Sequence, residues 1–211
     1  MPQRRLSLGC TPQQRLPLGC TTATLEHAAR YADIVDRVDK HFDAEVKPSL
    51  RPVPLLPGIE EALFVLSPDP VDVDTFRSAM GYTPRVLTVE TVALLMRLHC
   101  LLLKRVGVAQ MDQRLVAVQY TSMCAGQQRG KHFDKHDQGD IILTLTLAGS
   151  CCVRLYTRRG CMAHSFTQQK GAFYALSGAC VGHHPKFMHG LRAHVAGRRS
   201  VTFRSRIDRG R

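Results

Sequence analysis

Apolar residues in the first half of the chain recur at helical spacing in two segments. From Leu25 to Phe42 an apolar side chain returns every three or four residues, which places these side chains on one helix face. A second run, from Thr88 to about Val106, is apolar on most faces, so we expect it to pack beneath a sheet. Thr88 is a residue type that caps helix starts, and Gly107 is one that ends helices. Two helices are therefore predicted, over 25–42 and 88–106.

Prolines break the pattern between these helices, at positions 48, 52, 54, 57, 68 and 70. Proline has no amide hydrogen to donate and interrupts both helices and central strands. One short apolar run, from Ala62 to Leu66, lies among them. We expect this part to be mainly loop with one strand.

After Gly107 the spacing of apolar residues changes from helical to alternating. Short β-branched or alternating runs, separated by glycine and polar residues, are typical of strands. These runs are Leu115–Tyr120, Ile141–Leu147, Val153–Thr157, Ala172–Leu176 and Ser200–Ser205. Helices first and strands afterwards predict an α+β fold with a sandwich or barrel in the second half.

Length and composition fit one folded domain. The chain has 211 residues, of which 44% are hydrophobic and 22% charged, so it can bury one core and has no bias towards disorder. The longest apolar run, from Val92 to Leu103, contains Arg97 and His99 and is too short and too charged to span a bilayer. We therefore expect no membrane association.

The first residues differ from the rest of the chain. No acidic residue precedes Glu26, and Arg4, Arg5 and Arg15 stand among Ser, Thr and Gln, a composition compatible with an organellar transit segment. We predict that residues 1–22 are a flexible extension and residues 23–211 the domain. The expected location is intracellular, nuclear or cytoplasmic, or mitochondrial if the segment is a transit peptide.

Positive charge gathers in the last third of the chain. The formal net charge is +12, and residues 151–211 hold 12 Lys and Arg against 1 acidic residue. Such a concentration suits a polyanion, and nucleic acid is the commonest one, although a solvated basic surface would have the same composition. Candidates for phosphate contact are Arg154, Arg158, Arg159, Lys186, Arg192, Arg199 and Arg206.

The eight cysteines do not predict a disulfide framework or a zinc module. No secretory signal precedes them, no pair has the close spacing of a structural zinc site, and Cys151 and Cys152 would point to opposite faces of a strand. We expect free thiols.

A candidate metal site stands out in the second half of the chain. His132 and Asp134 are two residues apart, so on an extended backbone both side chains leave from one face. Two histidines and one carboxylate on one face of an Fe(II) ion leave the opposite positions open for co-substrate and oxygen. His189 is the leading third ligand, while His136 with Asp137, and His183 with His184, are competing ligands.

Two arginines follow the distal histidine. Arg198 and Arg204 are separated by an even number of residues on a predicted strand, which aims both guanidinium groups to one side. A planar guanidinium binds a carboxylate through two charge-assisted hydrogen bonds.

These residues together resemble the AlkB family of 2-oxoglutarate dioxygenases. The family pattern is a His-x-Asp pair, a distal His, then Arg, five residues and Arg, ending in Thr-Phe-Arg, and this chain has that order and spacing. The resemblance extends to Tyr120, to the stretch GAFYALSG over 171–178 and to the Gly190 that follows His189. It covers roughly residues 114–206.

The resemblance implies a double-stranded β-helix, or jelly roll, supported by the two predicted helices. It implies that His132, Asp134 and His189 bind Fe(II) and that the enzyme uses 2-oxoglutarate and O2. Arg198 would pair with the distal carboxylate of 2-oxoglutarate, Tyr120 would donate a hydrogen bond to it, and Arg204 would support it from the same strand.

The chain departs from the family pattern at two places. Val118 stands where members often have an Asn, and Lys135 and His136 stand where several members have a carboxylate that reads the damaged base. Aromatic candidates for stacking against a base are Phe133, Tyr156 and Phe187.

The function that the resemblance implies is oxidative demethylation of N-alkylated bases in DNA or RNA, acting on a single-stranded or flipped base. A first alternative is a hydroxylase or demethylase of a protein or other substrate in the same fold. A second is a nucleic-acid-binding protein without catalysis. No obligate protein partner is inferred.

Overall fold

The computed structural model describes residues 15–16, 20–24, 29–67, 69–80, 87–107, 113–134, 139–181 and 185–207. Its helices are α1 (Ala29–His41), α2 (Pro70–Met80) and α3 (Val89–Val106), and α1 continues into a π-helical turn, Phe42–Val46, and a 3-10 turn, Lys47–Ser49. Its strands are β1 (Arg15–Leu16), β2 (Cys20–Thr24), β3 (Arg51–Pro52), β4 (Ile59–Val65), β5 (Gln113–Met123), β6 (Gln128–His132), β7 (Ile141–Thr157), β8 (Met162–Gln169), β9 (Ala172–Ser177) and β10 (Phe187–Ile207). None of the helices it describes is long and apolar enough to cross a membrane.

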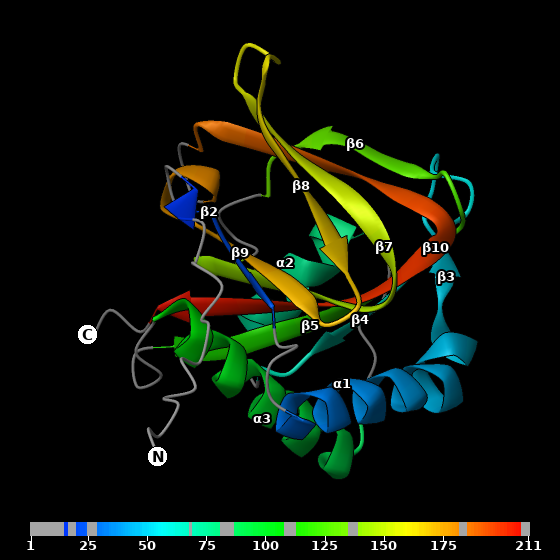
Figure 1. Ribbon diagram of the computed structural model, residues 1–211. Helices are drawn as coiled ribbons and strands as arrows, with labels where there is room; N and C mark the ends of the chain where they lie inside the picture. The colour runs from blue at the N-terminus through cyan, green and yellow to red at the C-terminus, as the bar shows by residue number, and fades with distance from the viewer. Residues whose placement is uncertain are drawn as a thin grey trace, which may run out of the picture.

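Two long strands, β7 and β10, organise the sheet. They pair with each other in antiparallel fashion along most of their length, and the sheet order is β1-β2-β9-β7-β10-β5-β4-β3. The first part of β7 pairs with β9 and its second part with β8, while β10 pairs first with β6 and then with β5. Each long strand therefore belongs to two layers, and the layers face each other as a double-stranded β-helix (Figure 1). The predicted α+β class with a jelly-roll core is confirmed.

The backbones of β7 and β10 approach each other closely at two glycines. Gly149 in β7 has a φ of +69°, and a Cβ atom built there would lie 2.1 Å from the carbonyl oxygen of Gly197 in β10. Gly197 itself has a φ of +72°. Only residues without a side chain permit this backbone conformation and this close approach.

Helices α1 and α3 lie along the outer side of the sheet that contains β5 and β9 (Figure 1). Their apolar faces and one face of the sheet form the larger core cluster, which includes Val38, Leu98, Tyr120, Leu145 and Phe203. A smaller cluster fills the space near β8 and β9 and includes Val153 and Leu176. The helices support the sheet and leave its other face available for a cavity.

The predicted ends of α3 are confirmed. The Thr88 hydroxyl accepts a hydrogen bond from the amide of Thr91, and Gly107 ends the helix in the left-handed conformation with a φ of 74°. Both are local effects that a side chain or its absence imposes on the adjacent turn. Helix α1 likewise lies within the predicted 25–42 segment.

The proline-rich segment contains a helix that the sequence interpretation missed. Helix α2 begins at Pro70, and the Asp69 carboxylate accepts a hydrogen bond from the amide of Val71. Proline is well tolerated at the first helical position, where its missing amide hydrogen has no partner to lose. The predicted strand in this segment is present as β4.

The segment that was expected to be an extension is described only in part. Residues 15–16 and 20–24 form β1 and β2, and β2 pairs with β9 from Cys20 to Thr24. The other residues of 1–22 lie outside the described ranges, so the division at residue 22 stays a prediction. The described cysteines, at positions 20, 100, 124, 151, 152, 161 and 180, are free thiols.

Candidate metal centre and adjoining cavity

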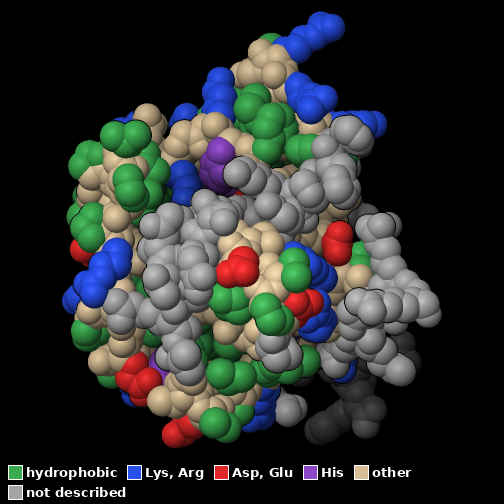
Figure 2. Space-filling model, turned by 180° about the vertical axis from the view of Figure 1, so that it is seen from behind, with side chains coloured by type: hydrophobic (Ala, Val, Ile, Leu, Met, Phe, Trp, Pro, Cys, Tyr) green, Lys and Arg blue, Asp and Glu red, His purple; other side chains and the backbone are tan. Residues whose placement is uncertain are grey.

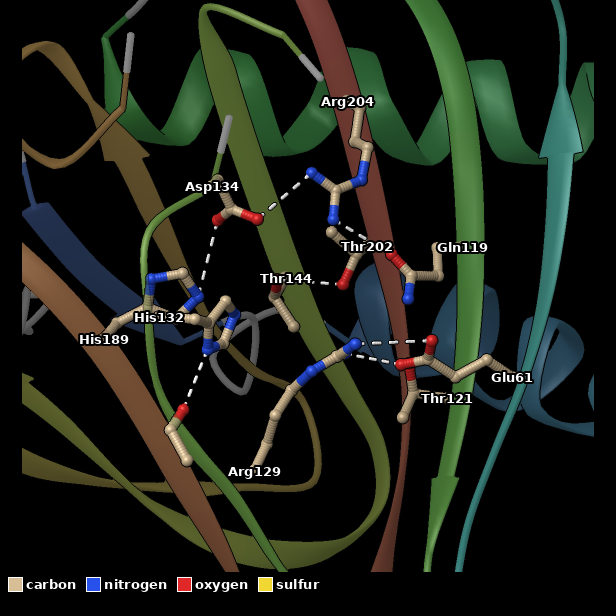
Figure 3. Close-up of polar contacts among 11 residues, drawn as sticks. Glu61, Gln119, Thr121, Arg129, His132, Asp134, Thr144, His189, Thr202 and Arg204 are labelled. Carbon is tan, nitrogen blue, oxygen red and sulfur yellow. Dashed lines mark hydrogen bonds and ion pairs between the residues drawn. The ribbon is translucent and has the colours of Figure 1, made fainter. Parts of the chain in front are cut away.

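The three predicted metal ligands meet at the mouth of the β-helix (Figure 3). His132 ends β6 and lies opposite His189 of β10 in the strand register, while Asp134 forms an isolated bridge with Val181. The ligand atoms of the three residues all lie within 4.8 Å of one another. The Nε2 atom of His189 is 3.4 Å from Oδ2 of Asp134, and the imidazole centroids of His132 and His189 are 4.2 Å apart.

A backbone contact orients one of the imidazoles. The Nδ1 atom of His132 lies 2.9 Å from the carbonyl oxygen of Gly130, so a proton on Nδ1 donates to that oxygen. The Nε2 lone pair of His132 is then free to bind a cation. An imidazole fixed in this way is the usual arrangement of a histidine metal ligand.

The electrostatics of the cluster favour the protonation states that a metal needs. Burial would raise the pKa of Asp134, but the opposing effect of His189, Arg204 and His132 lowers it to about 2. Burial lowers the pKa of His189 to about 3 and also lowers the pKa of His132. An ionised carboxylate and two neutral imidazoles are therefore present at neutral pH, and these are the forms that bind Fe(II).

A cavity of about 180 Å³ adjoins the cluster, inside the β-helix. Every second residue of a strand faces the same side, so alternate residues of each strand line the cavity. From β5 the cavity receives Gln119, Thr121 and Met123, and from β10 it receives Ser200 and Thr202. Hydroxyl and amide groups thus line much of its surface.

Tyr120 lies on the opposite face of β5 from this cavity. Its side chain is 0% exposed, belongs to the core beneath α1 and α3, and meets the Phe64 ring edge-on at a centroid distance of 5.8 Å. The expected hydrogen bond from Tyr120 to a co-substrate is therefore corrected, since its neighbours Gln119 and Thr121 face the cavity instead. The polar character of positions 119 and 121 beside apolar Val118 was the signal that could have identified the correct face.

The two predicted arginines both line the cavity and are buried. Arg204 lies beside the metal ligands, with Nη1 3.4 Å from Oδ1 of Asp134 and Nη2 donating to Gln119 over 3.0 Å. The Nε atom of Arg198 lies 3.4 Å from the Thr146 hydroxyl, and its buried Nη2 has no hydrogen-bond partner among the described residues. A buried guanidinium with an unsatisfied donor fits an acidic ligand in the cavity.

A further charged pair that the sequence did not indicate completes the wall. Arg129 of β6 lines the cavity and contacts Glu61 of β4 through both terminal nitrogens, with Nη1 2.5 Å from Oε1 and Nη2 3.4 Å from Oε2. The Thr121 hydroxyl donates to the same Oε1 atom. The two residues are far apart in the sequence, and only the position of Glu61 inside an apolar strand hints that it has a partner.

The competing ligands lie outside the described residues. His136, Asp137, His183 and His184 are not described, and neither is Lys135. Phe133, one of the stacking candidates, does line the cavity, and the Arg158 guanidinium carbon is 5.8 Å from its ring centroid.

Comparisons with known proteins identify the fold. No protein-family model and no curated protein matches the sequence. The structure titled "The structure of OsALKBH1" matches with a TM-score of 0.60 at 15% identity, covering 90% of this chain and 100% of that one. A prolyl-4-hydroxylase from Pseudomonas putida matches with a TM-score of 0.54 at 14% identity, covering 92% and 95% respectively. The chain therefore has the fold of an AlkB homologue and of a prolyl-4-hydroxylase over nearly its whole length.

Proposed function

We propose that this chain, which has the double-stranded β-helix fold, is an Fe(II)- and 2-oxoglutarate-dependent dioxygenase. The observation that carries this proposal is the cluster of half-buried His132 with buried Asp134 and His189 beside a cavity that Arg198 and Arg204 line. The cluster offers two neutral imidazoles and one carboxylate, which fit Fe(II). The cavity offers guanidinium donors, which fit the two carboxylates of 2-oxoglutarate.

The three candidate ligands and the two arginines have distinct parts in this proposal. His132, Asp134 and His189 would hold the metal, and bound iron would supply the activation of O2 and the oxidation of a substrate C–H bond. Arg198, with Thr146 and Ser200 beside it, would bind the distal carboxylate of 2-oxoglutarate. Arg204 would orient Asp134 and neutralise negative charge near the metal.

The substrate that we propose is an N-alkylated base in DNA or RNA. In the overall reaction one atom of O2 enters succinate as 2-oxoglutarate loses CO2, and the other enters the N-methyl group. The resulting N-hydroxymethyl group leaves as formaldehyde and the nitrogen keeps a proton. The motif resemblance to AlkB dioxygenases supports this choice, as does the distribution of exposed cations.

Cations surround the hairpin that joins β7 to β8, which projects beyond the rest of the sheet (Figure 1). Arg158 and Arg159 are exposed at its tip, and Nζ of Lys131 donates to the Gly160 carbonyl over 2.9 Å. Lys and Arg side chains gather at this end of the molecule in Figure 2. Because Arg158 also approaches Phe133 at the cavity wall, a strand bound along the hairpin would pass the cavity mouth.

Two of the predicted phosphate contacts do not belong to this surface. Arg199 pairs with Asp39 and Asp43, and Arg206 pairs with buried Asp72. Both guanidinium groups hold helices against the sheet, so we assign them a structural part.

A second candidate function keeps the chemistry and changes the substrate. The prolyl-4-hydroxylase from Pseudomonas putida has the same fold, which favours hydroxylation of a protein as the alternative. A non-catalytic nucleic-acid binder is less well supported, because it would have no use for two imidazoles, a carboxylate and two guanidinium groups that converge on one cavity.

The decisive experiment measures succinate formed by purified protein with Fe(II), ascorbate and 2-oxoglutarate. Wild type is compared with Asp134→Ala and with a matched control, Asp36→Ala, whose carboxylate is on the exposed side of α1. We expect succinate from wild type and Asp36→Ala but not from Asp134→Ala. Methylated single-stranded DNA or RNA should stimulate succinate formation and release formaldehyde. Absence of both iron binding and turnover in wild type would refute the oxygenase.

A further inference from the structure

The pair formed by Arg129 and Glu61 presents its positive end, the Arg129 guanidinium, at the cavity wall (Figure 3). Glu61 is 2% exposed and does not itself line the cavity, whereas Arg129 does. Two guanidinium nitrogens contact the Glu61 carboxylate, and Thr121 donates to the same carboxylate. Three elements, β4, β5 and β6, therefore hold the Arg129 guanidinium between its acidic partner and the cavity.

The charge of Arg129 reaches the metal cluster. It is among the groups that lower the pKa values of His132, His189 and Asp134. A substrate group that approaches the metal would experience the same field. Asp134 and His189 are buried, where water screens charge poorly, whereas the Arg129 side chain is 25% exposed.

Cations outnumber acids among the described residues that line the cavity. Arg129, Arg198 and Arg204 all contribute a guanidinium, while Asp134 contributes the one carboxylate. Asp134 contacts His189 and Arg204, and the nearby Glu61 contacts Arg129 and Thr121. In the described wall, no carboxylate remains to pair with a positively charged substrate.

We infer that the cavity selects neutral N-alkylated bases over their cationic isomers and that Arg129 is the residue that determines this selection. The inference rests on the proposed function and specifies its substrate class. A divalent metal and the dianion of 2-oxoglutarate cancel each other in charge, so binding both leaves the excess of guanidinium groups in place. A base that carries a delocalised positive charge would then approach like charges, with no free carboxylate among the described residues of the wall to compensate them.

Pairs of isomeric bases test the selection directly. 1-Methyladenine is a cation at neutral pH and N6-methyladenine is neutral, and the same contrast holds for 3-methylcytosine and N4-methylcytosine. Each base is placed in the same single-stranded oligonucleotide, and binding is followed by fluorescence anisotropy with Mn(II) in place of iron. We expect wild type to bind the neutral isomer of each pair at least about fivefold more tightly. Succinate and formaldehyde formation by the iron-loaded protein should follow the same order.

Two variants separate charge from shape. Arg129→Gln removes the positive charge and leaves Glu61 as a carboxylate beside the cavity, so the binding ratio should move towards the cationic isomers by about tenfold or more. The double variant Arg129→Gln/Glu61→Gln also shortens the side chain at 129 but provides no carboxylate. Its ratio should lie between those of wild type and Arg129→Gln. Circular dichroism and Mn(II) affinity confirm that each variant is folded.

The outcomes distinguish this inference from the proposed function. Equal or tighter binding of the cationic isomers by wild type would overturn the inference, even if both isomers are demethylated. A ratio that is the same in wild type and Arg129→Gln would also overturn the assignment of Arg129. If no isomer is bound or oxidised but succinate forms with a peptide substrate, the nucleic acid function itself fails.

Discussion

At the residue scale, neighbouring positions of β5 serve different parts of the molecule. Gln119 and Thr121 line the cavity and contact Arg204 and Glu61 respectively, while Tyr120 between them fills the core beneath the helices. A side chain on a strand lies on one face only, so a shift of the strand register by one residue would move a cavity residue into the core and a core residue into the cavity. The part that a residue near the site plays therefore depends on the face of the strand on which it lies as well as on its chemical type.

Arg198 and Tyr120 provide a direct comparison. Arg198→Met should raise the Kd for 2-oxoglutarate by roughly 30-fold or more. The substitution removes a buried guanidinium whose Nη2 has no hydrogen-bond partner among the described residues and would donate to a carboxylate of the co-substrate. Tyr120→Phe should leave that Kd unchanged, since its ring lies on the other face of β5. Isothermal titration of Mn(II)-loaded protein with 2-oxoglutarate measures both. A weakened affinity in Tyr120→Phe alone would contradict the placement of these side chains.

His99 gives the fold a dependence on pH. Its ring is buried, lies 2.7 Å from the Ser205 hydroxyl and stacks on Phe203, and burial lowers its pKa from 6.5 to about 4. Between these pH values the unfolded chain binds a proton that the folded chain does not. The contribution of His99 to the free energy of unfolding is therefore fully present well above pH 6.5. It is lost as the pH drops, by roughly 2 kcal/mol at pH 5.

Urea unfolding at pH 7 and pH 5 tests this contribution when wild type is compared with His99→Gln. Glutamine can still contact Ser205 but carries no titratable group. The loss of stability between the two pH values should be smaller in the variant by about the stated amount. An equal loss in both proteins would mean that His99 does not titrate as described.

Sequence reasoning succeeded where the responsible residues are close together in the chain. The i, i+2 spacing of His132 and Asp134 and the even spacing of Arg198 and Arg204 are local, and the structure brings all four to one cavity. The pair of Arg129 with Glu61 joins distant strands, and no local pattern could have indicated it. Tyr120 was expected from the family resemblance to contact the co-substrate, but it lies in the core, because the face of β5 on which each residue lies depends on partners that the sequence does not reveal.

At the element scale, strands and helices differ in how readily their sequences reveal them. Helix α3 carries its own start and stop signals in Thr88 and Gly107. Strands β6 and β8 were missed, because their residues are largely exposed or half-buried and lack a continuous apolar face. They exist because β7 and β10 extend beyond the main sheet and offer hydrogen-bonding edges there.

Ion pairs between α1 and the sheet should differ in strength according to burial. Arg199 of β10 joins Asp39 and Asp43 with a half-buried guanidinium, whereas Lys170 pairs with Asp36 where both side chains are 53% exposed. Arg199→Ala should destabilise the protein by about 1 kcal/mol, and Lys170→Ala by less than about 0.5 kcal/mol. Urea midpoints measure the difference. Equal midpoints for the two variants would argue against a special role of Arg199 in docking α1.

At the scale of the whole molecule, the net charge of +12 is not all available at the surface, because some of the basic side chains form ion pairs within the fold. Arg199 and Arg206 neutralise acids of α1, the turn that follows it and α2, while Arg158 and Arg159 stay exposed on the projecting hairpin. The surface available to a polyanion is therefore smaller than the sequence count implies, and it lies beside the cavity mouth.

Salt dependence can locate the nucleic-acid surface. The double variant Arg158→Ala/Arg159→Ala should bind single-stranded DNA more weakly, and the slope of log Kd against log salt should fall by about 2, one for each lost phosphate contact. Arg37→Ala/Arg97→Ala removes the same charge from exposed positions on α1 and α3 and should leave the slope unchanged. Anisotropy titrations at several salt concentrations give both slopes. Equal slopes for the two variants would show that only the net charge matters.

The long strand β10 brings together His189, Arg198 and Arg204, and it is the last described strand in the chain. A ribosome delivers residues in sequence order, so the first two metal ligands leave the exit tunnel well before the third ligand and both arginines. Until β10 inserts between β7 and β5, the nascent chain has only His132 and Asp134 of the three candidate ligands, and neither arginine, at this cavity. In the proposed oxygenase, activation of O2 would therefore begin only after β10 has completed the barrel.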